Sequence, residues 1–117
     1  MQQPHENIAL AFAQTMVENQ FAEAHQLMST SAQQTLTVVD LEKKYANMAA
    51  YFSQPANHVE VIEALSDWPG KLAGDVAWVY VSIDNGSQAE AVSVTLEQVI
   101  NSAANEILIR EIIWGRP

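Results

Sequence analysis

The chain has 117 residues, of which 49% are hydrophobic, and this length and composition suit one domain (residues 1–117) with a single packed core. It contains no cysteine, which excludes disulfides, thiolate catalysis and cysteine-ligated zinc or iron–sulfur sites. Its 14 acidic and 5 basic side chains give a formal charge of −9, which repels nucleic-acid phosphates and anionic membranes, so we expect neither as a partner.

The N-terminal residues, MQQPHENIALAF, have neither the basic region nor the long apolar region of a secretory signal. No apolar run in the chain approaches the roughly 20 residues that span a membrane. Together with the absence of cysteine, these features lead us to expect a cytoplasmic protein.

Apolar side chains recur at helical spacing in the first thirty residues. Pro4 suits the start of a helix, and Ile8, Phe12 and Met16 follow at intervals of four, which predicts a helix over residues 5–18. A second, shorter helix is predicted from Phe21, and it ends near residues 29–31 (Ser-Thr-Ser).

The third predicted helix has the clearest start. Thr37 and Asp40 have the spacing of a capping box, in which a hydroxyl and an acid three residues later satisfy the first backbone N–H groups. Pro55 ends the helical pattern. One apolar stripe follows the cap, and it is expected to pack on the core and also to serve as part of a ligand wall: Leu41, Tyr45, Met48 and Phe52.

The second half of the chain reads as strands. Residues 58–65 (HVEVIEAL) alternate in polarity and favour a strand, with a fragment of helix as the alternative. Residues 66–74 contain Pro69-Gly70 and predict a long loop that suits a mobile flap. Three further strands are predicted over residues 75–84, 89–99 and 106–114.

Asn85-Gly86 predicts a hairpin between the second and third strands, because both positions tolerate positive φ. A two-residue loop would place Val79 opposite Val92 and Trp78 opposite Ser93, whereas a three-residue loop would change these pairs. One sheet face is then purely apolar: Ala77, Val79, Val81, Ile83, Val92, Val94 and Leu96. The other face mixes aromatic and polar groups: Val76, Trp78, Tyr80, Ser93, Thr95 and Glu97.

Helices first and an antiparallel sheet afterwards predict an α+β domain. We expect N-terminal helices packed on the apolar face of a curved, largely antiparallel β-sheet.

This order of elements resembles the nuclear-transport-factor-2-like superfamily, the cone-shaped, cystatin-like α+β group that includes polyketide-cyclase-like and ketosteroid-isomerase-like proteins. The resemblance is carried by residues 9–29 (ALAFAQTMVENQFAEAHQLMS), residues 37–48 (TVVDLEKKYANM) and residues 107–117 (ILIREIIWGRP). It implies a pocket between the bent sheet and the helices, and homodimers formed through the sheet. The fold hosts isomerases, dehydratases, cyclases, adaptors and immunity proteins, so it leaves the function open.

No local motif matches the catalytic residues of that superfamily, so no catalytic residue is assigned. An isomerase-type site would need a desolvated carboxylate and an acidic donor. Glu60, Glu63, Glu97 and Glu111 lie in or beside strands, and Tyr45 and Tyr80 are candidate donors. We expect a pocket for a small apolar ligand near the following residues: Tyr45, Met48, Phe52, His58, Glu97 and Glu111.

The remaining chemical motifs are missing from the sequence. Of His5, His25 and His58, only His58 is expected near a pocket rim, and no pair has the spacing of a helical metal site. The scattered glycines form neither a phosphate-binding loop nor a dinucleotide fingerprint. We therefore expect no metal and no cofactor.

Trp78 and Tyr80 share the mixed sheet face, where large aromatic side chains often mark an interface. We expect a homodimer through this face, formed by Trp78, Tyr80, Ser93 and Thr95. A partly exposed or core aromatic pair and a ligand-pocket wall are the alternatives.

Three functions remain open from the sequence. The first is a non-catalytic small-molecule or protein-binding module that acts as a homodimer. The second is an isomerase, dehydratase or cyclase that uses a buried carboxylate and a tyrosine. The third is an acidic immunity or adaptor protein for a basic partner, which its charge would attract.

Overall fold

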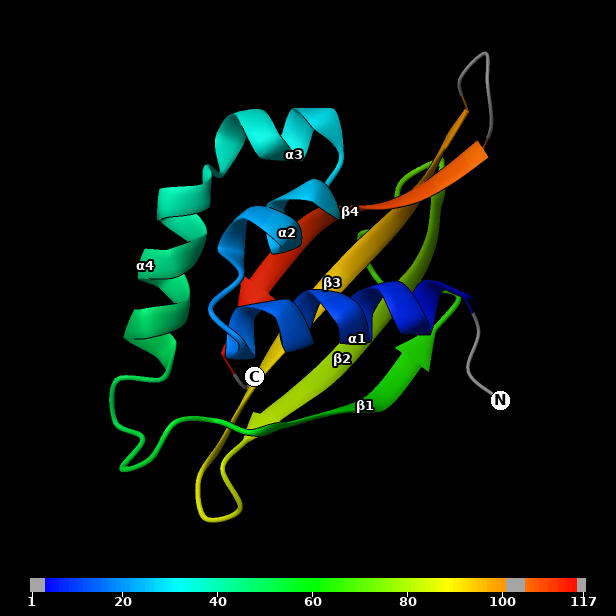
Figure 1. Cartoon of the computed structure of the whole chain (residues 1–117). Coiled ribbons are helices and arrows are strands. Elements are labelled where there is room, and N and C mark those ends of the chain that lie inside the picture. Colours follow the sequence, from blue (N-terminus) through cyan, green and yellow to red (C-terminus); the bar gives the residue numbers. More distant parts are fainter. Residues whose placement is uncertain (1–3, 101–104, 116–117) are drawn as a thin grey trace.

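The computed structural model of the chain describes residues 4–100 and 105–115. Within these residues the chain is an α+β domain in which helices lie on one side of a four-stranded sheet (Figure 1). The helices are α1 (Pro4–Val17), α2 (Phe21–Gln26), α3 (Thr30–Thr35) and α4 (Val38–Met48). The strands are β1 (His58–Leu65), β2 (Asp75–Asp84), β3 (Ala89–Ile100) and β4 (Asn105–Trp114), antiparallel and in sequence order.

The predicted helix over residues 5–18 and the predicted strands are confirmed to within about a residue. The prediction that residues 29–31 only end the second helix is wrong, because α3 begins there. The Ser29 hydroxyl accepts a hydrogen bond from the N–H of Ala32 at 3.3 Å and so caps a new helix. The same short polar run follows the end of one helix and begins the next.

The capping box of α4 is confirmed. The N–H of Thr37 donates to Asp40 at 3.0 Å, and the N–H of Asp40 donates to the Thr37 hydroxyl at 3.1 Å. The helix ends at Met48, however, so Phe52 lies in the turn beyond it, where its N–H donates to the Ala49 carbonyl. The stripe predicted from Leu41 to Phe52 is therefore not carried by one helix.

The hairpin between β2 and β3 has a four-residue loop, residues 85–88, and the predicted two-residue loop is wrong. The Asn85 side-chain oxygen accepts hydrogen bonds from the N–H groups of Ser87 and Gln88 at 2.9 and 2.7 Å, which stabilises the longer loop. Val79 consequently pairs with Val94 and Trp78 with Thr95. Ala77 and Tyr80, predicted opposite Val94 and Ala91, pair instead with Leu96 and Ser93. The register moves by two residues, an even shift, so every side chain keeps its predicted face.

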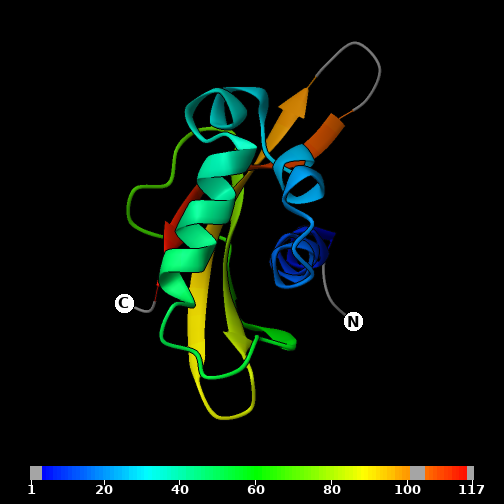
Figure 2. The same cartoon turned by 60° about the vertical axis from the view of Figure 1, so that its left-hand side comes forward.

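The face predicted to be purely apolar forms the core. All seven of its residues in β2 and β3 are fully buried, and so are Phe12 and Met16 of α1. α1 packs across β1 and β2, while α2 bridges α1 and α4. Figure 2 shows α1 and α2 on one side of the sheet and the loop of residues 66–74 on the other.

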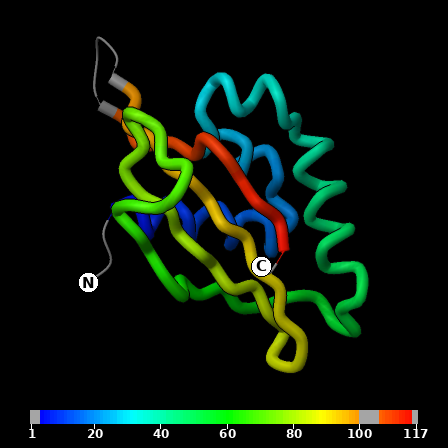
Figure 3. The backbone as a smooth tube through the Cα atoms, turned by 180° about the vertical axis from the view of Figure 1, so that it is seen from behind, coloured from blue at the N-terminus to red at the C-terminus, as the bar shows by residue number. Residues whose placement is uncertain are grey.

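The opposite side of the sheet, which we call the open sheet face, carries no helix among the described residues. Figure 3 views this side, with the strands in front of the helices. From Ala77 to Asp84, β2 alternates between fully buried residues and half-buried residues, and the half-buried residues belong to the open sheet face. A register shift separates this stretch from Asp75, which pairs with Glu97. The sheet therefore has one side in the core and one side facing outward, as antiparallel sheets often do.

A buried ion pair links the end of the loop to β4. A bulge in β4 leaves Arg110 without a partner residue in β3. The Arg110 guanidinium makes two hydrogen bonds to the Asp75 carboxylate, at 2.8 and 2.9 Å, and the N–H of Leu72 adds a third at 2.8 Å. The Asp75 side chain is 1% exposed.

These contacts decide the charge state of Asp75. Burial by itself raises the pKa of this carboxyl, but the hydrogen bonds from Arg110 and from the Leu72 N–H outweigh burial, so the pKa lies below its usual value. A lowered pKa means that the pair stabilises the fold fully above the unfolded-state pKa of about 4 and loses this effect as the pH falls through the lowered pKa.

We predict that Arg110→Gln lowers the free energy of unfolding by about 3 kcal/mol at neutral pH, because it leaves a buried carboxylate without its cation. The deficit should shrink as the pH is lowered from about 7 to about 3, since the unpaired Asp75 can then take up a proton. Urea unfolding across this range measures both effects. Lys43→Gln, at an exposed position of α4, is the control and should change little; a small, pH-independent deficit for Arg110→Gln would contradict the prediction.

Candidate functional site

Two adjoining pockets form a groove, which we call the α4–β4 groove. One has a volume of about 520 Å³ and lies between α3 and β4. The other has a volume of about 470 Å³ and lies between α4, Tyr51 and the paired ends of β3 and β4. Lys44 and Trp114 line both pockets, so the two are continuous. Each is of the size that binding sites for small ligands have.

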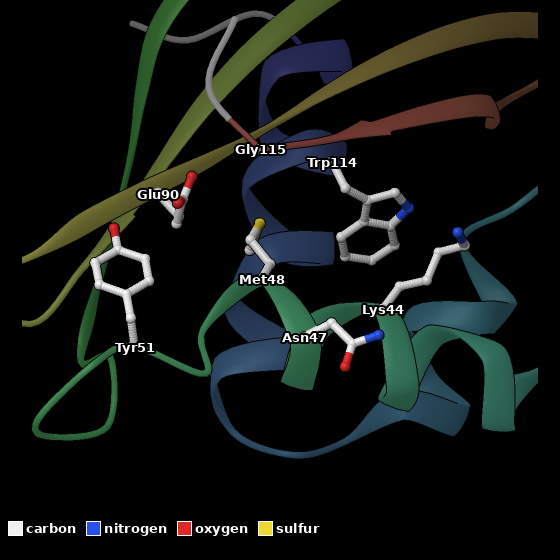
Figure 4. Close-up of a pocket in the computed structure, with 7 residues that line it drawn as sticks. All are labelled: Lys44, Asn47, Met48, Tyr51, Glu90, Trp114 and Gly115. Carbon is white, nitrogen blue, oxygen red and sulfur yellow. The ribbon is translucent and has the colours of Figure 1, made fainter.

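The groove is positioned by the register of β4 and by the helical phase of α4. Trp114 pairs with Val92, a core residue, so its side chain lies on the helix-covered side of the sheet. Met48 and Lys44, one turn apart on α4, face it (Figure 4). The groove thus has an aromatic wall on the strand and an apolar and a cationic side chain on the helix.

The end of the groove near Tyr51 is held by hydrogen bonds. The Tyr51 hydroxyl donates to the Ala89 carbonyl at 2.7 Å, and the Gln88 side chain donates to the Tyr51 carbonyl at 2.9 Å. Tyr51 and Phe52 also make an edge-to-face contact, with ring centroids 5.1 Å apart. The segment after α4 is therefore tied to the β2–β3 loop, which closes this end of the groove.

The structure distributes the six predicted pocket residues over several places. Met48 and Glu111 line the α4–β4 groove. Tyr45 and Phe52 line a separate pocket of about 260 Å³ between α1, α4 and the following turn, where burial raises the pKa of Tyr45. The remaining two lie outside these three pockets: His58 and Glu97.

Glu97 lies on the open sheet face, opposite Asp75 in the ladder and 3.9 Å from Arg110. It therefore belongs to the surroundings of the buried ion pair. Glu111 is exposed in β4. Neither carboxylate is enclosed by the helices as an isomerase-type base would be.

Lys44 and Trp114 are groove residues that the sequence reasoning did not assign to a site. Trp114 could have been found from the strand pattern, since it falls on the core parity of β4 after the bulge at Arg110. Lys44 carries no such signal, because a lysine in a helix normally points to solvent.

His25 holds helices together. Its Nε2 lies 3.0 Å from the Leu36 carbonyl oxygen and 3.4 Å from that of Gln33, and the Gln33 side chain donates to the His25 carbonyl at 2.8 Å. These contacts tie α2 to α3. His25 therefore acts in packing at this position.

His58 is paired with Asp84 across the first ladder, with 2.9 Å between Nδ1 and the carboxylate oxygen. The hydrogen bond that His58 donates to Asp84 raises the pKa of the imidazole above its usual value. Burial opposes this increase, and the nearby Asp84 and Glu60 charges add to it. Asp84 also accepts from the N–H of Gly86 at 3.0 Å. The pair thus anchors the start of β1 to the β2–β3 loop.

We predict that His58 titrates above about 6.5, its usual value, and that Asp84→Asn returns it toward that value. The raised pKa means that the pair contributes to stability below the unfolded-state pKa, and this contribution is lost as the pH rises through the folded-state pKa. NMR titration of the His58 imidazole in the wild type and in Asp84→Asn measures the shift. An unchanged His58 pKa in Asp84→Asn would show that the pair does not set it.

The four residues predicted for a dimer interface are neighbours on the open sheet face. Tyr80 pairs with Ser93, and Trp78 pairs with Thr95. The two aromatic rings are stacked, with centroids 6.1 Å apart and an interplanar angle of 27°. On the other side of Ser93 lies Ile113, which is 55% exposed. Ser93 and Thr95 are themselves buried, so the accessible part of this surface is formed by the half-buried Trp78 and Tyr80 and by the exposed Ile113.

In the part of the chain that the structure describes, no group of three histidine, aspartate or glutamate side chains is placed to hold a metal ion. Over the same residues, no helix is long and apolar enough to cross a membrane.

Comparison of the chain with known protein families, with curated proteins and with solved structures finds no match. The fold and its surfaces therefore carry the functional argument.

Proposed function

We propose that this protein is a non-catalytic small-molecule or protein-binding module that acts as a homodimer, and that it belongs to the nuclear-transport-factor-2-like superfamily. Helices followed by an antiparallel sheet, with one face covered and one face open, support this assignment. The α4–β4 groove is the ligand site of the proposed module.

The observation that carries the proposal is the stacked Trp78–Tyr80 pair on the open sheet face. Tryptophan and tyrosine dominate the binding energy of many interfaces, and here Ile113 extends the same surface. Apolar surface that faces water often marks an interaction site. In a twofold dimer the same patch on two copies covers itself, which removes both patches from water.

The ionisable groups also favour binding over catalysis. The charged residues of the α4–β4 groove are Lys44, Glu90, Arg110 and Glu111, of which Lys44 and Glu111 are exposed. Catalysis of the isomerase kind depends on a carboxyl whose pKa is raised by desolvation next to a donor such as a tyrosine. Tyr45, a half-buried candidate donor, lines a different pocket.

We predict that the wild type sediments as a dimer and that Trp78→Glu sediments as a monomer, because the substitution places a charge in the centre of the apolar patch. Loss of a central aromatic residue typically costs about 2 kcal/mol or more, which weakens self-association at least about thirtyfold. Sedimentation velocity over a range of concentrations measures this.

Val39→Glu is the matched control, since Val39 is 59% exposed on α4 and lies outside the open sheet face. Circular dichroism and the thermal midpoint should show that both variants fold. A wild type that remains monomeric at high concentration, or a Trp78→Glu variant that associates as strongly as Val39→Glu, would refute the dimer.

A further inference from the structure

The sheet has two edge strands, and they differ in how they are protected. β1 is interrupted by a bulge at Ile62 and carries Glu60 and Glu63, features that discourage pairing with another strand. β4 has its bulge at Arg110, and the stretch after it continues to Trp114 without interruption. The half of β4 that follows the bulge is therefore the less protected edge.

The ladder between β3 and β4 fixes where the edge groups of this half point. The N–H of Gly115 donates to the Ala91 carbonyl at 2.8 Å, while Trp114 and Ile112 oppose Val92 and Val94. In an antiparallel pair, bonded and non-bonded positions alternate. The backbone N–H and C=O groups of Ile112 and Trp114 consequently point away from β3, toward the edge.

The same edge already pairs with an extended segment of this chain. The N–H of Ile109 donates to the Leu27 carbonyl at 2.9 Å, and its carbonyl accepts from the N–H of Ser29 at 2.8 Å, which makes a parallel bridge at Met28. The chain then turns away into α3. Among the described residues, no backbone group bonds to the edge side of Ile112 or Trp114.

A helix beside a sheet edge often protects it, but α4 leaves room here. In Figures 1 and 3, α4 lies beyond β4 rather than over the middle of the sheet. The α4–β4 groove separates the two, with Ile112 and Trp114 on one wall and Leu36 and Met48 on the other. Unpaired backbone groups and apolar walls thus occur in one groove.

We propose that this groove binds an extended peptide of a partner protein, which adds as a fifth strand to the edge of β4 at Ile112 and Trp114. This inference deepens the proposed binding function and names its partner class. Alternate side chains of such a peptide point into the groove, where the apolar walls accept aliphatic groups.

The side chains between them point to the open side, where Glu111 neighbours them. Glu111 also borders the groove, and together with the charge of −9 this carboxylate at the edge selects basic residues at those positions. The peptide class is therefore one in which aliphatic and basic residues alternate.

The probe is a fluorescein-labelled heptapeptide of alternating valine and lysine, and fluorescence anisotropy with the full chain measures its binding. It should bind at least tenfold more tightly than the matched peptide of valine and glutamate. Equal affinities would overturn the charge assignment and with it the proposed partner class.

Backbone methylation separates strand addition from simple charge attraction. Methylating the amide nitrogens of alternate residues in one phase blocks the groups that face β4, and in the other phase blocks only groups that face solvent. One phase should reduce affinity at least tenfold and the other should leave it nearly unchanged. If both phases act alike, no strand is added and the proposal is wrong.

Ile112→Pro tests the protein side. Proline removes the N–H of Ile112 that points outward and leaves the hydrogen bonds between β3 and β4 intact. Edge strands tolerate proline at such positions. We expect at least a tenfold loss of affinity for the valine–lysine peptide, with Ile112→Val retaining wild-type affinity. Unchanged binding by a folded Ile112→Pro variant would overturn the proposal; if this variant does not fold, the methylation series on the wild type still decides.

Trp78→Glu distinguishes this inference from the dimer, because its substitution lies on the open sheet face and leaves the edge of β4 intact. Trp78→Glu should bind the valine–lysine peptide with wild-type affinity even where it no longer dimerises. Peptide binding lost in Trp78→Glu but kept in Ile112→Pro would place the peptide on the open sheet face and overturn the edge site.

Discussion

The alternation of β2 is the constraint on which the rest of the structure depends. Its side chains are in turn fully buried and half-buried from Ala77 to Asp84, and it lies between β1 and β3 in the sheet. The buried set is aliphatic and offers the helices one continuous surface, which is the main source of stability in a domain of this size. The half-buried side chains cannot enter the core without exposing the buried ones. The open sheet face must therefore face outward.

The bulge at Arg110 reconciles this alternation with β4. Without it, Ile109 and Ile112 would fall on opposite faces, yet Ile109 is fully buried and Ile112 packs against the same core. The extra residue restores the parity and directs a guanidinium to Asp75 on the other side. One irregularity therefore completes the core and neutralises a buried carboxylate at the base of the loop of residues 66–74.

The elements whose pattern is local could be predicted from the sequence. The period of two in residues 75–99 placed every side chain on its correct face even though the hairpin loop was predicted two residues too short, because an even shift preserves the faces. α3 was missed because the residue types that cap the start of a helix also occur where a helix ends. The contact of His25 with the Leu36 carbonyl shows that the chain folds back against α2 at this point. The end of α4 at Met48 was missed because helical spacing continues into Phe52.

The candidate sites follow the same division. Trp78, Tyr80, Ser93 and Thr95 could be grouped from the sequence, since strand alternation puts them on one face. The six pocket candidates could not be located, because their grouping depends on where α4 lies relative to β4. The position of α4 is set by its packing on α2 and by the hydrogen bonds that join Tyr51 to Gln88 and Ala89. These residues are nearly forty positions apart in the chain, so no local pattern encodes the contact.

The two proposed surfaces are compatible because they belong to different parts of one sheet. The open sheet face is formed by side chains of β2 and β3 that point out of the plane of the sheet, away from the helices. The edge of β4 instead exposes backbone groups that lie in the plane of the sheet. A dimer through the face would leave Ile112 and Trp114 accessible from the side of α4. Ile113, between them, points to the open face and belongs to the dimer surface. A small domain can therefore present two binding surfaces that share a strand and use different groups of it.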